Sequence, residues 1–326
     1  MYRSVVQSAR LVWLLIVICL TLAFFNYPRS WWQELIAATA PLWTPFLLVG
    51  IYVQLRGFTR AAFSLIGIAL FSLQVLCVVK VARNLAPYLY SPQKTYASVE
   101  YSSPMRFLFL DVSARGQERS QSSITGLIDT KDPDIIIVAR DSEKAVSSQA
   151  YARYPFVLAS SADSKRKVEI FSKTSLSPPL KTDYGFGALP AVFGVFQTSD
   201  GAPFQLGGFD LLPSSSQENF NESRLTSRRL ASALKFSSEP RIAVGAFRTS
   251  VTSQIVEMYV GPLKLRSVFF NSGFARCLRL IRASFPFDRN LNVFAARKIE
   301  VTELKDILSD DGSYAAILFT ARIPRT

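Results

Sequence analysis

The stretch "RIAVGAFRTS", residues 241–250, combines the pattern of a buried strand with an end that carries no catalytic group. The apolar run from Ile242 to Val244 predicts the last part of a buried strand, and a Gly-Ala-Phe turn follows it. The side chains that this strand delivers are a methyl group, Ala246, and a cation, Arg248. The stretch therefore has the form of an approach to an active site without the acid, base or nucleophile that catalysis needs.

The composition of the whole chain removes further kinds of chemistry. None of the 326 residues is a histidine, so no imidazole is available for proton transfer or metal binding. The three cysteines are Cys19, Cys77 and Cys277, and the first two lie inside apolar runs. A single cysteine outside those runs allows neither an intradomain disulfide nor a cysteine-based metal site. We expect no cofactor.

The charge balance favours an anionic neighbour of a particular kind. The chain has 37 basic and 24 acidic residues and a formal net charge of +13, spread along its length. Such a spread excess suits a membrane surface. No compact lysine and arginine block is present, so we do not expect nucleic acid as a partner.

The first 83 residues contain three apolar stretches, 11–25, 35–55 and 61–79. The second and third approach the roughly 20 residues that a membrane-spanning helix needs, and the first does so when it is extended back through Val5. We predict three transmembrane helices within residues 1–83. A cleaved signal peptide is the alternative for the first stretch, but "NYPRSWW" follows it in place of a small-residue cleavage site.

The basic residues of the short loops predict the orientation of these helices. Arg3 and Arg10 precede the first stretch, and Arg56 and Arg60 occupy the second loop. The positive-inside rule then places the N-terminus in the cytoplasm and the C-terminal domain on the other side. Two basic residues just after the third stretch oppose this orientation, and the short loops carry more weight.

The remainder of the chain reads as a linker, 84–103, followed by one soluble domain, 104–326. Short runs rich in Val, Ile and Phe predict strands with a few helices between them, which indicates a sheet core with helices packed outside. The predicted strands are 106–112, 134–140, 167–173, 191–198, 204–212, 241–247, 266–270, 291–297 and 315–323, and the predicted helices are 116–130, 142–150, 217–236 and 251–259.

Several segments of this domain follow one another in a recognisable order. They are "MRFLFLDV" (105–112), "DPDIIIVARD" (132–141), "YARYPFVLAS" (151–160), "FQLGGFDLLP" (204–213), "IAVGAFRTS" (242–250), "FPFDRNLNVF" (285–294) and "DGSYAAILF" (311–319). Their order and spacing resemble the endonuclease/exonuclease/phosphatase (DNase I-like) family, in the bacterial form with three N-terminal membrane spans. The resemblance implies an α+β fold: a DNase I-like four-layer α/β sandwich of two packed, mainly antiparallel sheets flanked by helices, preceded by three transmembrane helices.

The first half of the family's site is altered in this chain. By the resemblance, Asp111 stands where the family has a metal-site asparagine. Arg140 stands at the metal-binding glutamate, with Asp141 one place later, and Asp210 takes the place of a histidine. A cation at the glutamate position would repel a divalent metal ion.

The second half of the family's site is altered as well. Ala246 stands where the family has its water-activating aspartate, and Arg248 where it has an asparagine. Asp288 is retained, but the residues of the closing segment are Tyr314 for an aspartate and Ala315 for the histidine that Asp288 would orient. Because these groups act together in phosphate-ester hydrolysis, their joint loss leaves no catalytic residue to assign.

The resemblance therefore implies a pseudoenzyme, and we expect neither a catalytic nor a metal site. The expected role is that of a non-catalytic scaffold or accessory subunit of a membrane complex. Its expected partners are the lipid bilayer and other subunits of that complex. Its expected location is the bacterial inner membrane, crossed three times, with the C-terminal domain in the periplasm.

Two alternatives remain open at this stage. Four aspartates could form a new oxygen-ligand metal site and make the chain a metal-dependent phosphodiesterase or phosphatase with an unusual ligand set. They are Asp111, Asp141, Asp210 and Asp288. Alternatively, Arg140, Arg248 and Arg289 could clamp a phosphate group in an anion- or lipid-binding module. In the simplest interpretation, these acids and arginines form ion pairs with one another.

Overall fold

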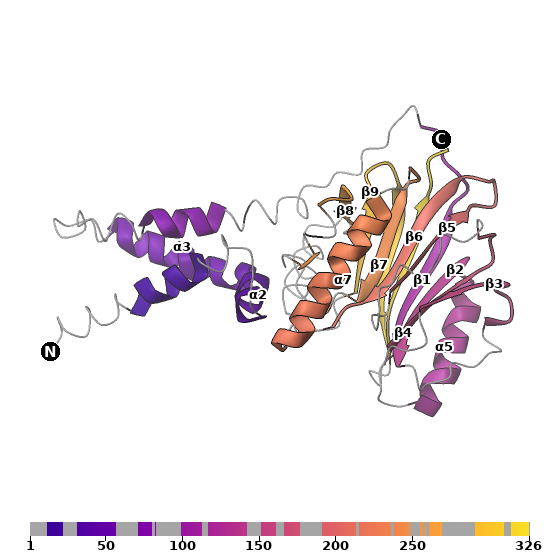
Figure 1. The fold of residues 1–326 in the computed structure, drawn as a ribbon, viewed down its shortest axis with the longest axis horizontal. Coiled ribbons are helices and arrows are strands. Elements are labelled where there is room, and N and C mark those ends of the chain that lie inside the picture. The colour runs from indigo at the N-terminus through magenta and orange to yellow at the C-terminus, as the bar shows by residue number, and fades with distance from the viewer. Residues whose placement is uncertain are drawn as a thin grey trace.

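In the computed structural model, an N-terminal group of helices lies beside a sandwich of two β-sheets (Figure 1). The structure describes residues 12–21, 31–56, 71–79, 82, 99–112, 117–141, 151–160, 166–176, 191–212, 215–235, 238–246, 248, 255–256, 258, 261–268, 291–309 and 314–325.

The first sheet has six strands in the order β10-β11-β1-β2-β4-β3. β1 and β2 run parallel, and the other neighbours in this sheet are antiparallel. The helix α5, Gln117–Lys131, connects the two parallel strands. The strands are β1 (Met105–Val112), β2 (Ile135–Asp141), β3 (Phe156–Ala159), β4 (Arg166–Ser172), β10 (Glu300–Leu308) and β11 (Tyr314–Arg322).

The second sheet has five strands in the order β5-β6-β7-β9-β8 and repeats the same design. Its one parallel pair is β6 with β7, and the helix α7, Gln217–Lys235, connects them. The strands are β5 (Ala191–Gln197), β6 (Pro203–Asp210), β7 (Arg241–Ala246), β8 (Leu265–Ser267) and β9 (Leu291–Ala296).

Most of the predicted elements are confirmed. Each predicted strand coincides wholly or in part with a strand of the structure, and the helices predicted at 116–130 and 217–236 are α5 and α7. The predictions missed β3 and β10. The helices predicted at 142–150 and 251–259 lie outside the described residues, except for 255–256 and 258, which are helical.

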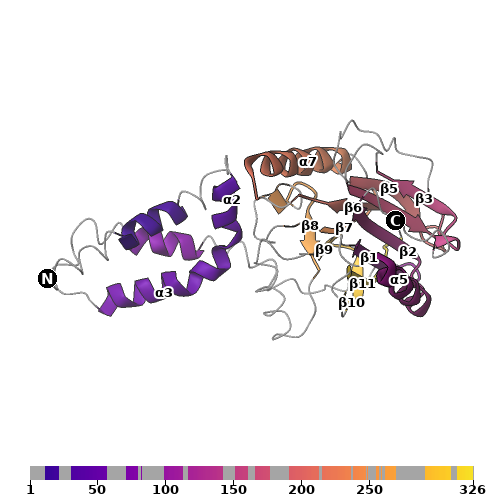
Figure 2. The same ribbon diagram turned by 90° about the horizontal axis from the view of Figure 1, so that it is seen from below.

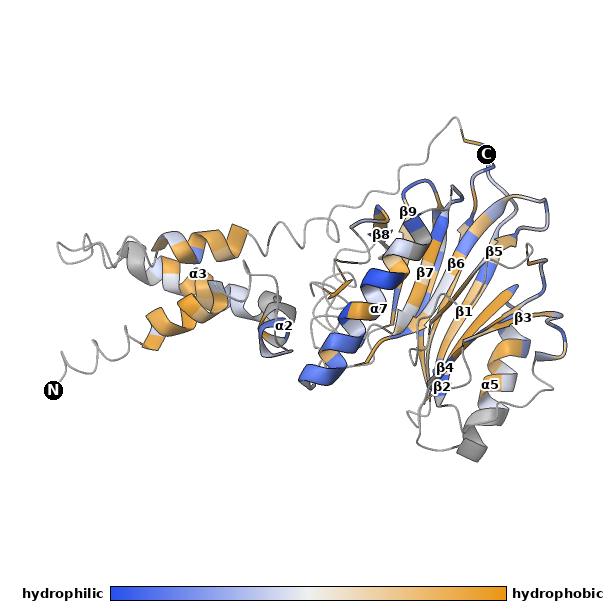
Figure 3. Cartoon of the chain, in the orientation of Figure 1, coloured by the Kyte–Doolittle hydropathy of each residue, from blue (hydrophilic) through white to orange (hydrophobic). Residues whose placement is uncertain are grey.

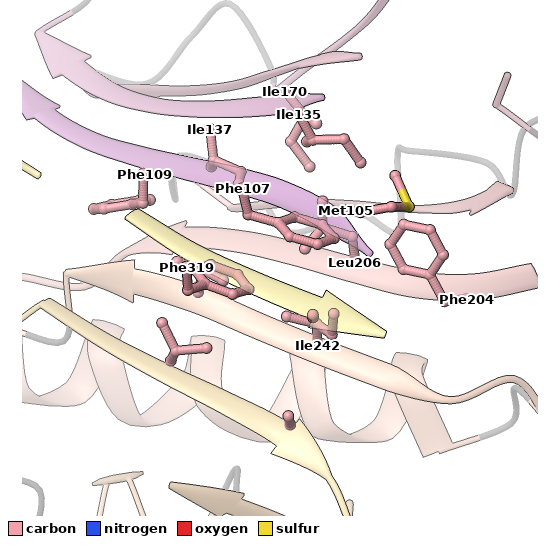
Figure 4. Close-up of a cluster of buried hydrophobic side chains, with 14 of the residues drawn as sticks. Met105, Phe107, Phe109, Ile135, Ile137, Ile170, Phe204, Leu206, Ile242 and Phe319 are labelled. Carbon is pink, nitrogen blue, oxygen red and sulfur yellow. The ribbon is translucent and has the colours of Figure 1, made fainter. Parts of the chain in front are cut away.

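The main core lies between the two sheets (Figure 4). Phe107 of β1 stacks on Phe319 of β11, with ring centroids 4.7 Å apart, and meets Phe204 of β6 edge-on at 5.9 Å. A Cβ atom added at Gly208 would lie 2.7 Å from the side chain of Ile137 on the facing sheet. The two sheets therefore pack closely over apolar side chains, with a glycine at a point of tight contact.

The outer faces of both sheets are covered by the two connecting helices. Ile124 and Ile128 of α5 pack in one cluster with Leu108 and Leu110 of β1. On the other side, α7 packs through Phe220 and Leu230 on Phe209 and Ala243, and its hydrophilic side faces away from the sheet (Figures 2 and 3). Helix, sheet, sheet and helix thus form four layers, which is the predicted α+β sandwich.

The described N-terminal helices are 12–21, α2 (Trp31–Ala38), α3 (Ala40–Arg56) and 71–79. None of the helices within the described residues is both long enough and apolar enough to cross a membrane; α3 has 17 residues and contains Pro45. The three predicted transmembrane helices are thus not confirmed and stay a prediction. Trp31 joins this region to the sandwich, because its side chain packs against the α7 cluster and its backbone N–H donates to Gln217 Oε1 at 3.2 Å.

The linker predicted at 84–103 is described only from residue 99 onward. Its last residues pair with the other end of the domain: the N–H of Ser102 donates to the carbonyl of Ile323 at 2.8 Å, and Tyr101 bridges to Pro324. These residues therefore belong to the sandwich, which begins a few positions earlier than the predicted residue 104.

Candidate functional site

The carboxyl ends of the two parallel strand pairs meet at one edge of the sandwich, and the predicted site residues lie there. In the first sheet, Asp111 is opposite Ala139 on one side and Ala315 on the other. In the second sheet, Asp210 is opposite Ala246. Open α/β sheets bind their ligands at such an edge, so this is the candidate site.

Strand alternation decides which residues of this edge face the space between the sheets. Asp111 follows Phe109 by two residues, and Asp210 follows Gly208 by two, so both carboxylates lie on the inner face. Ala246 is itself part of the inner core, and Ala315 precedes the inner residue Ile317 by two. The inner edge thus presents two carboxylates and two methyl groups.

Arg248 lies between the two carboxylates and binds both. Its Nε donates to Asp210 Oδ1 at 2.7 Å, and its Nη2 donates to Asp111 Oδ1 at 3.1 Å and Oδ2 at 3.2 Å. The side chains of Asp111 and Asp210 are 1% and 0% exposed, and that of Arg248 is 19% exposed. We call these three residues the ion cluster; it links the first sheet to the second.

The ion cluster keeps its guanidinium charged. Burial by itself would lower the pKa of Arg248, but the negative charges of Asp210 and then Asp111 outweigh it and raise this pKa above its usual range. Arg248 also has a backbone φ of 46°, in the left-handed region. A non-glycine residue there costs roughly 1–2 kcal/mol, so the surrounding contacts hold it in place.

Gly245 allows β7 to approach β6 closely just before the ion cluster. A Cβ atom at this position would lie 2.2 Å from the carbonyl oxygen of Phe209 on the neighbouring strand. Only a glycine permits this approach, because the obstacle is backbone that no side-chain rotation can move. The glycine of "VGAF" is therefore required by the close pairing of β6 and β7.

Arg140 lies on the opposite face of its sheet from the ion cluster. It follows Val138, an outer-face residue, by two positions. Its Nε donates to Glu169 Oε2 at 2.9 Å and its Nη2 to Glu169 Oε1 at 3.0 Å. The structure thus does not bring Arg140 together with Arg248, and the inner face of β2 ends at Ala139 and the position of Asp141.

Tyr314 also lies on the outer face, within the cluster that α5 covers. Its hydroxyl is 3.3 Å from the hydroxyl of Ser123 on α5, so it contacts a helix and not the ion cluster. The side chain of Asp141 and all of Asp288 and Arg289 lie outside what the structure describes.

The described residues do not fit the divalent metal that the resemblance implies. They contain no group of three or more His, Cys, Asp or Glu side chains placed to hold a metal ion. The two inner carboxylates bind a permanent cation, and Ala246 and Ala315 supply no ligand atom. The described part of the site therefore lacks the ligands for metal-assisted hydrolysis.

The fold is shared with solved structures. It matches an endonuclease/exonuclease/phosphatase from Bacteroides vulgatus with a TM-score of 0.52 and 12% identity, over 68% of this chain and all of that one. A second such protein, from Beutenbergia cavernae, gives a TM-score of 0.48 and 12% identity over 68% of this chain and 72% of that one. The human Nocturnin catalytic domain gives a TM-score of 0.49 and 14% identity, over 71% of this chain and 97% of that one.

The protein therefore has the DNase I-like fold of the endonuclease/exonuclease/phosphatase proteins, as the sequence motifs predicted. No family model and no curated protein matches the sequence.

Sequence reasoning missed the partners of the two outer residues. Glu169 and Ser123 carry no motif, and nothing in their local sequence links them to Arg140 and Tyr314. The period of two along a strand places Arg140 on the same face as Ile136 and Val138, but both faces of this run are apolar, so only the structure shows that this is the outer face.

Proposed function

We propose that this chain is a membrane-anchored pseudoenzyme with a DNase I-like domain, acting as a non-catalytic scaffold or accessory subunit of a membrane complex. The observation that carries the proposal is the ion cluster, in which Arg248 forms ion pairs with both inner carboxylates of the site edge. A guanidinium in that place repels a divalent cation, and Ala246 beside it cannot activate water.

The membrane part of the proposal is supported by the surface of the N-terminal helices. Large apolar side chains are exposed on all four described helices there, whereas those of the described sandwich are scattered singly at Val157, Leu225 and Leu308. A gathering of this kind is unusual in water and suits a lipid environment (Figure 3). The exposed residues are Val12, Leu15, Ile18, Trp32, Phe46, Leu48, Val49, Tyr52, Leu76 and Val79.

A hydrolysis assay tests the absence of catalysis. The full chain, purified in a mild non-ionic detergent, is incubated with a generic phosphodiester and a generic phosphomonoester in the presence of Mg²⁺ or Mn²⁺. We expect background hydrolysis, equal in the wild type and in Asp111→Ala. Turnover by the wild type that disappears in Asp111→Ala would establish a metal-dependent phosphoesterase instead.

Membrane topology is tested with the full chain in a bacterial host. We propose the inner membrane, a cytoplasmic N-terminus and a periplasmic C-terminal domain. Resistance to alkaline extraction and activity of a periplasm-dependent reporter fused after Thr326 are the expected results. Release by alkali, or a reporter active only in the cytoplasm, contradicts them.

The scaffold role is tested by purification in mild detergent without crosslinking. We expect other membrane proteins to accompany the chain in fixed stoichiometry through two different columns. A monodisperse chain with lipid alone would remove the support for a complex subunit.

A further inference from the structure

Two carboxylates from different sheets share one cation at the site edge. Asp111 is the last residue but one of β1 and Asp210 is the last residue of β6, so each carboxylate is fixed by a separate sheet. Arg248 meets Asp210 through Nε and Asp111 through Nη2. Nη2 also lies 3.4 Å from Asp210 Oδ2, so one guanidinium nitrogen serves both acids.

Facing carboxylates in a buried place need a positive charge between them or must take up a proton. In proteins that charge is often a bound divalent cation, which prefers carboxylate oxygens. Here the positive charge belongs to the guanidinium group of Arg248, which follows the end of β7 by two residues. Because this group is part of the chain it cannot dissociate, and it keeps its proton. Its left-handed backbone shows that the chain adopts an unfavourable conformation to deliver it there.

We propose that Arg248 is a built-in substitute for a metal ion: it neutralises Asp111 and Asp210, binds the two sheets together and closes the site edge to divalent cations. Removing it uncovers a latent two-carboxylate cation site. The inference rests on the proposed non-catalytic function, since it gives the physical reason why the site edge takes no metal.

Arg140 and Glu169 provide a matched control on the same sheet. This pair is also bidentate and partly buried, with side chains 12% and 15% exposed, but it lies on the outer face of the sheet and contains one carboxylate where the ion cluster contains two. Loss of Arg140 should destabilise the protein without uncovering a pair of carboxylates. Both arginines are changed to asparagine, which tolerates the left-handed backbone at position 248.

The experiment measures the thermal midpoint, Tm, of the full chain in a non-ionic detergent with and without millimolar Mg²⁺, Mn²⁺ or Ca²⁺, at matched ionic strength. We expect the wild-type Tm to be unchanged by these ions. Arg248→Asn should have a lower Tm and recover most of the loss with at least one of them. Arg140→Asn should have a lower Tm and recover none.

A second variant locates the uncovered site. In Arg248→Asn combined with Asp210→Asn, one of the two carboxylates is gone, and recovery by divalent cations should disappear. If Arg248→Asn fails to fold, Arg248→Lys keeps a positive charge and should fold with a lower Tm that divalent cations leave unchanged.

A wild-type Tm raised by divalent cations overturns the proposal, as does an Arg248→Asn variant with no recovery, or an Arg248→Lys variant that divalent cations stabilise. These outcomes are separate from those of the hydrolysis assay. An inactive wild type stabilised by Mg²⁺ would refute the built-in cation and leave the non-catalytic function standing. Turnover by the wild type without added divalent cations would refute the non-catalytic function and leave the built-in cation standing.

Discussion

Gly245→Ala is expected to destabilise the site edge and lower the Tm of the protein, although it adds a single methyl group. That methyl would lie 2.2 Å from the carbonyl oxygen of Phe209 and 2.7 Å from its ring. Ordinary contact begins at 3.4 Å, so β6 and β7 would have to separate locally by about 1.2 Å. The hydrogen bond from Leu211 N to Ala246 O, 2.9 Å long, lies next to this point and would be broken.

The magnitude follows from these two effects. Forcing a methyl group into a packed interior costs about 1–3 kcal/mol, and a lost backbone hydrogen bond adds about 1 kcal/mol. For a domain of this size each kcal/mol lowers Tm by about 2–4 °C, so we expect a fall of about 10 °C. Thermal unfolding of the full chain in detergent, followed by near-ultraviolet circular dichroism, measures it.

Gly126→Ala is the matched control with the opposite sign. Gly126 lies in α5 and is exposed, and a Cβ atom added there would meet nothing within 4 Å beyond the backbone of its own helix. Alanine there should stabilise the helix by about 0.5–1 kcal/mol. A Gly245→Ala variant as stable as the wild type would refute the close approach of β6 and β7 and, with it, the stated reason for the glycine.

Three smaller effects can be measured in the same way. Hydrogen bonds from the Thr198 hydroxyl and then from Arg325 hold the pKa of Asp200 below its usual range, so the ionised carboxylate stabilises the fold at neutral pH and this stabilisation is lost in acid. Asp200→Asn should therefore lower Tm at neutral pH, and the difference in Tm between variant and wild type should narrow below about pH 4. A difference that stays constant in acid would contradict this. Tyr314→Phe removes a 3.3 Å hydroxyl contact and should lower the free energy of unfolding by no more than about 1 kcal/mol in urea titrations. Gly208→Ala places a methyl 2.7 Å from an isoleucine side chain of the facing sheet and should cost about 1–3 kcal/mol; no change in the urea midpoint would argue against the tight sheet contact.

The strands that the sequence predicts most clearly, such as β2 and β7, are buried on both faces. The runs 135–139 and 242–246 contain no polar side chain, because a sheet covers one face of each strand and a helix the other. The two missed strands are the two opposite edge strands of the first sheet. β3 has four residues, and β10 carries charges and an irregular register between Val301 and Glu303, which destroys the period-two pattern.

The candidate site was predictable in its positions and less so in its contacts. Asp111, Asp210, Ala246 and Ala315 gather at one inner edge, as their places at the ends of the motif strands suggested. The bond of Arg248 to both acids depends on a distance between two sheets that no local pattern contains. Ion pairs between the four aspartates and the three site arginines were predicted; Arg248 forms them with Asp111 and Asp210, whereas Arg140 pairs with Glu169, which the prediction did not include.

The position of β11 also constrains how this chain can be made. β11 lies between β10 and β1, and Met105 of β1 pairs with Ala321 of β11. The central strand β1 therefore gains its second neighbour only when residues more than 200 positions later in the sequence are available. Until then β1, with its run of phenylalanine and leucine, has one open edge on the nascent chain. The long separation in sequence between β1 and β11 predicts slow folding, and until β11 is in place the open edge of β1 leaves an intermediate that is prone to aggregation.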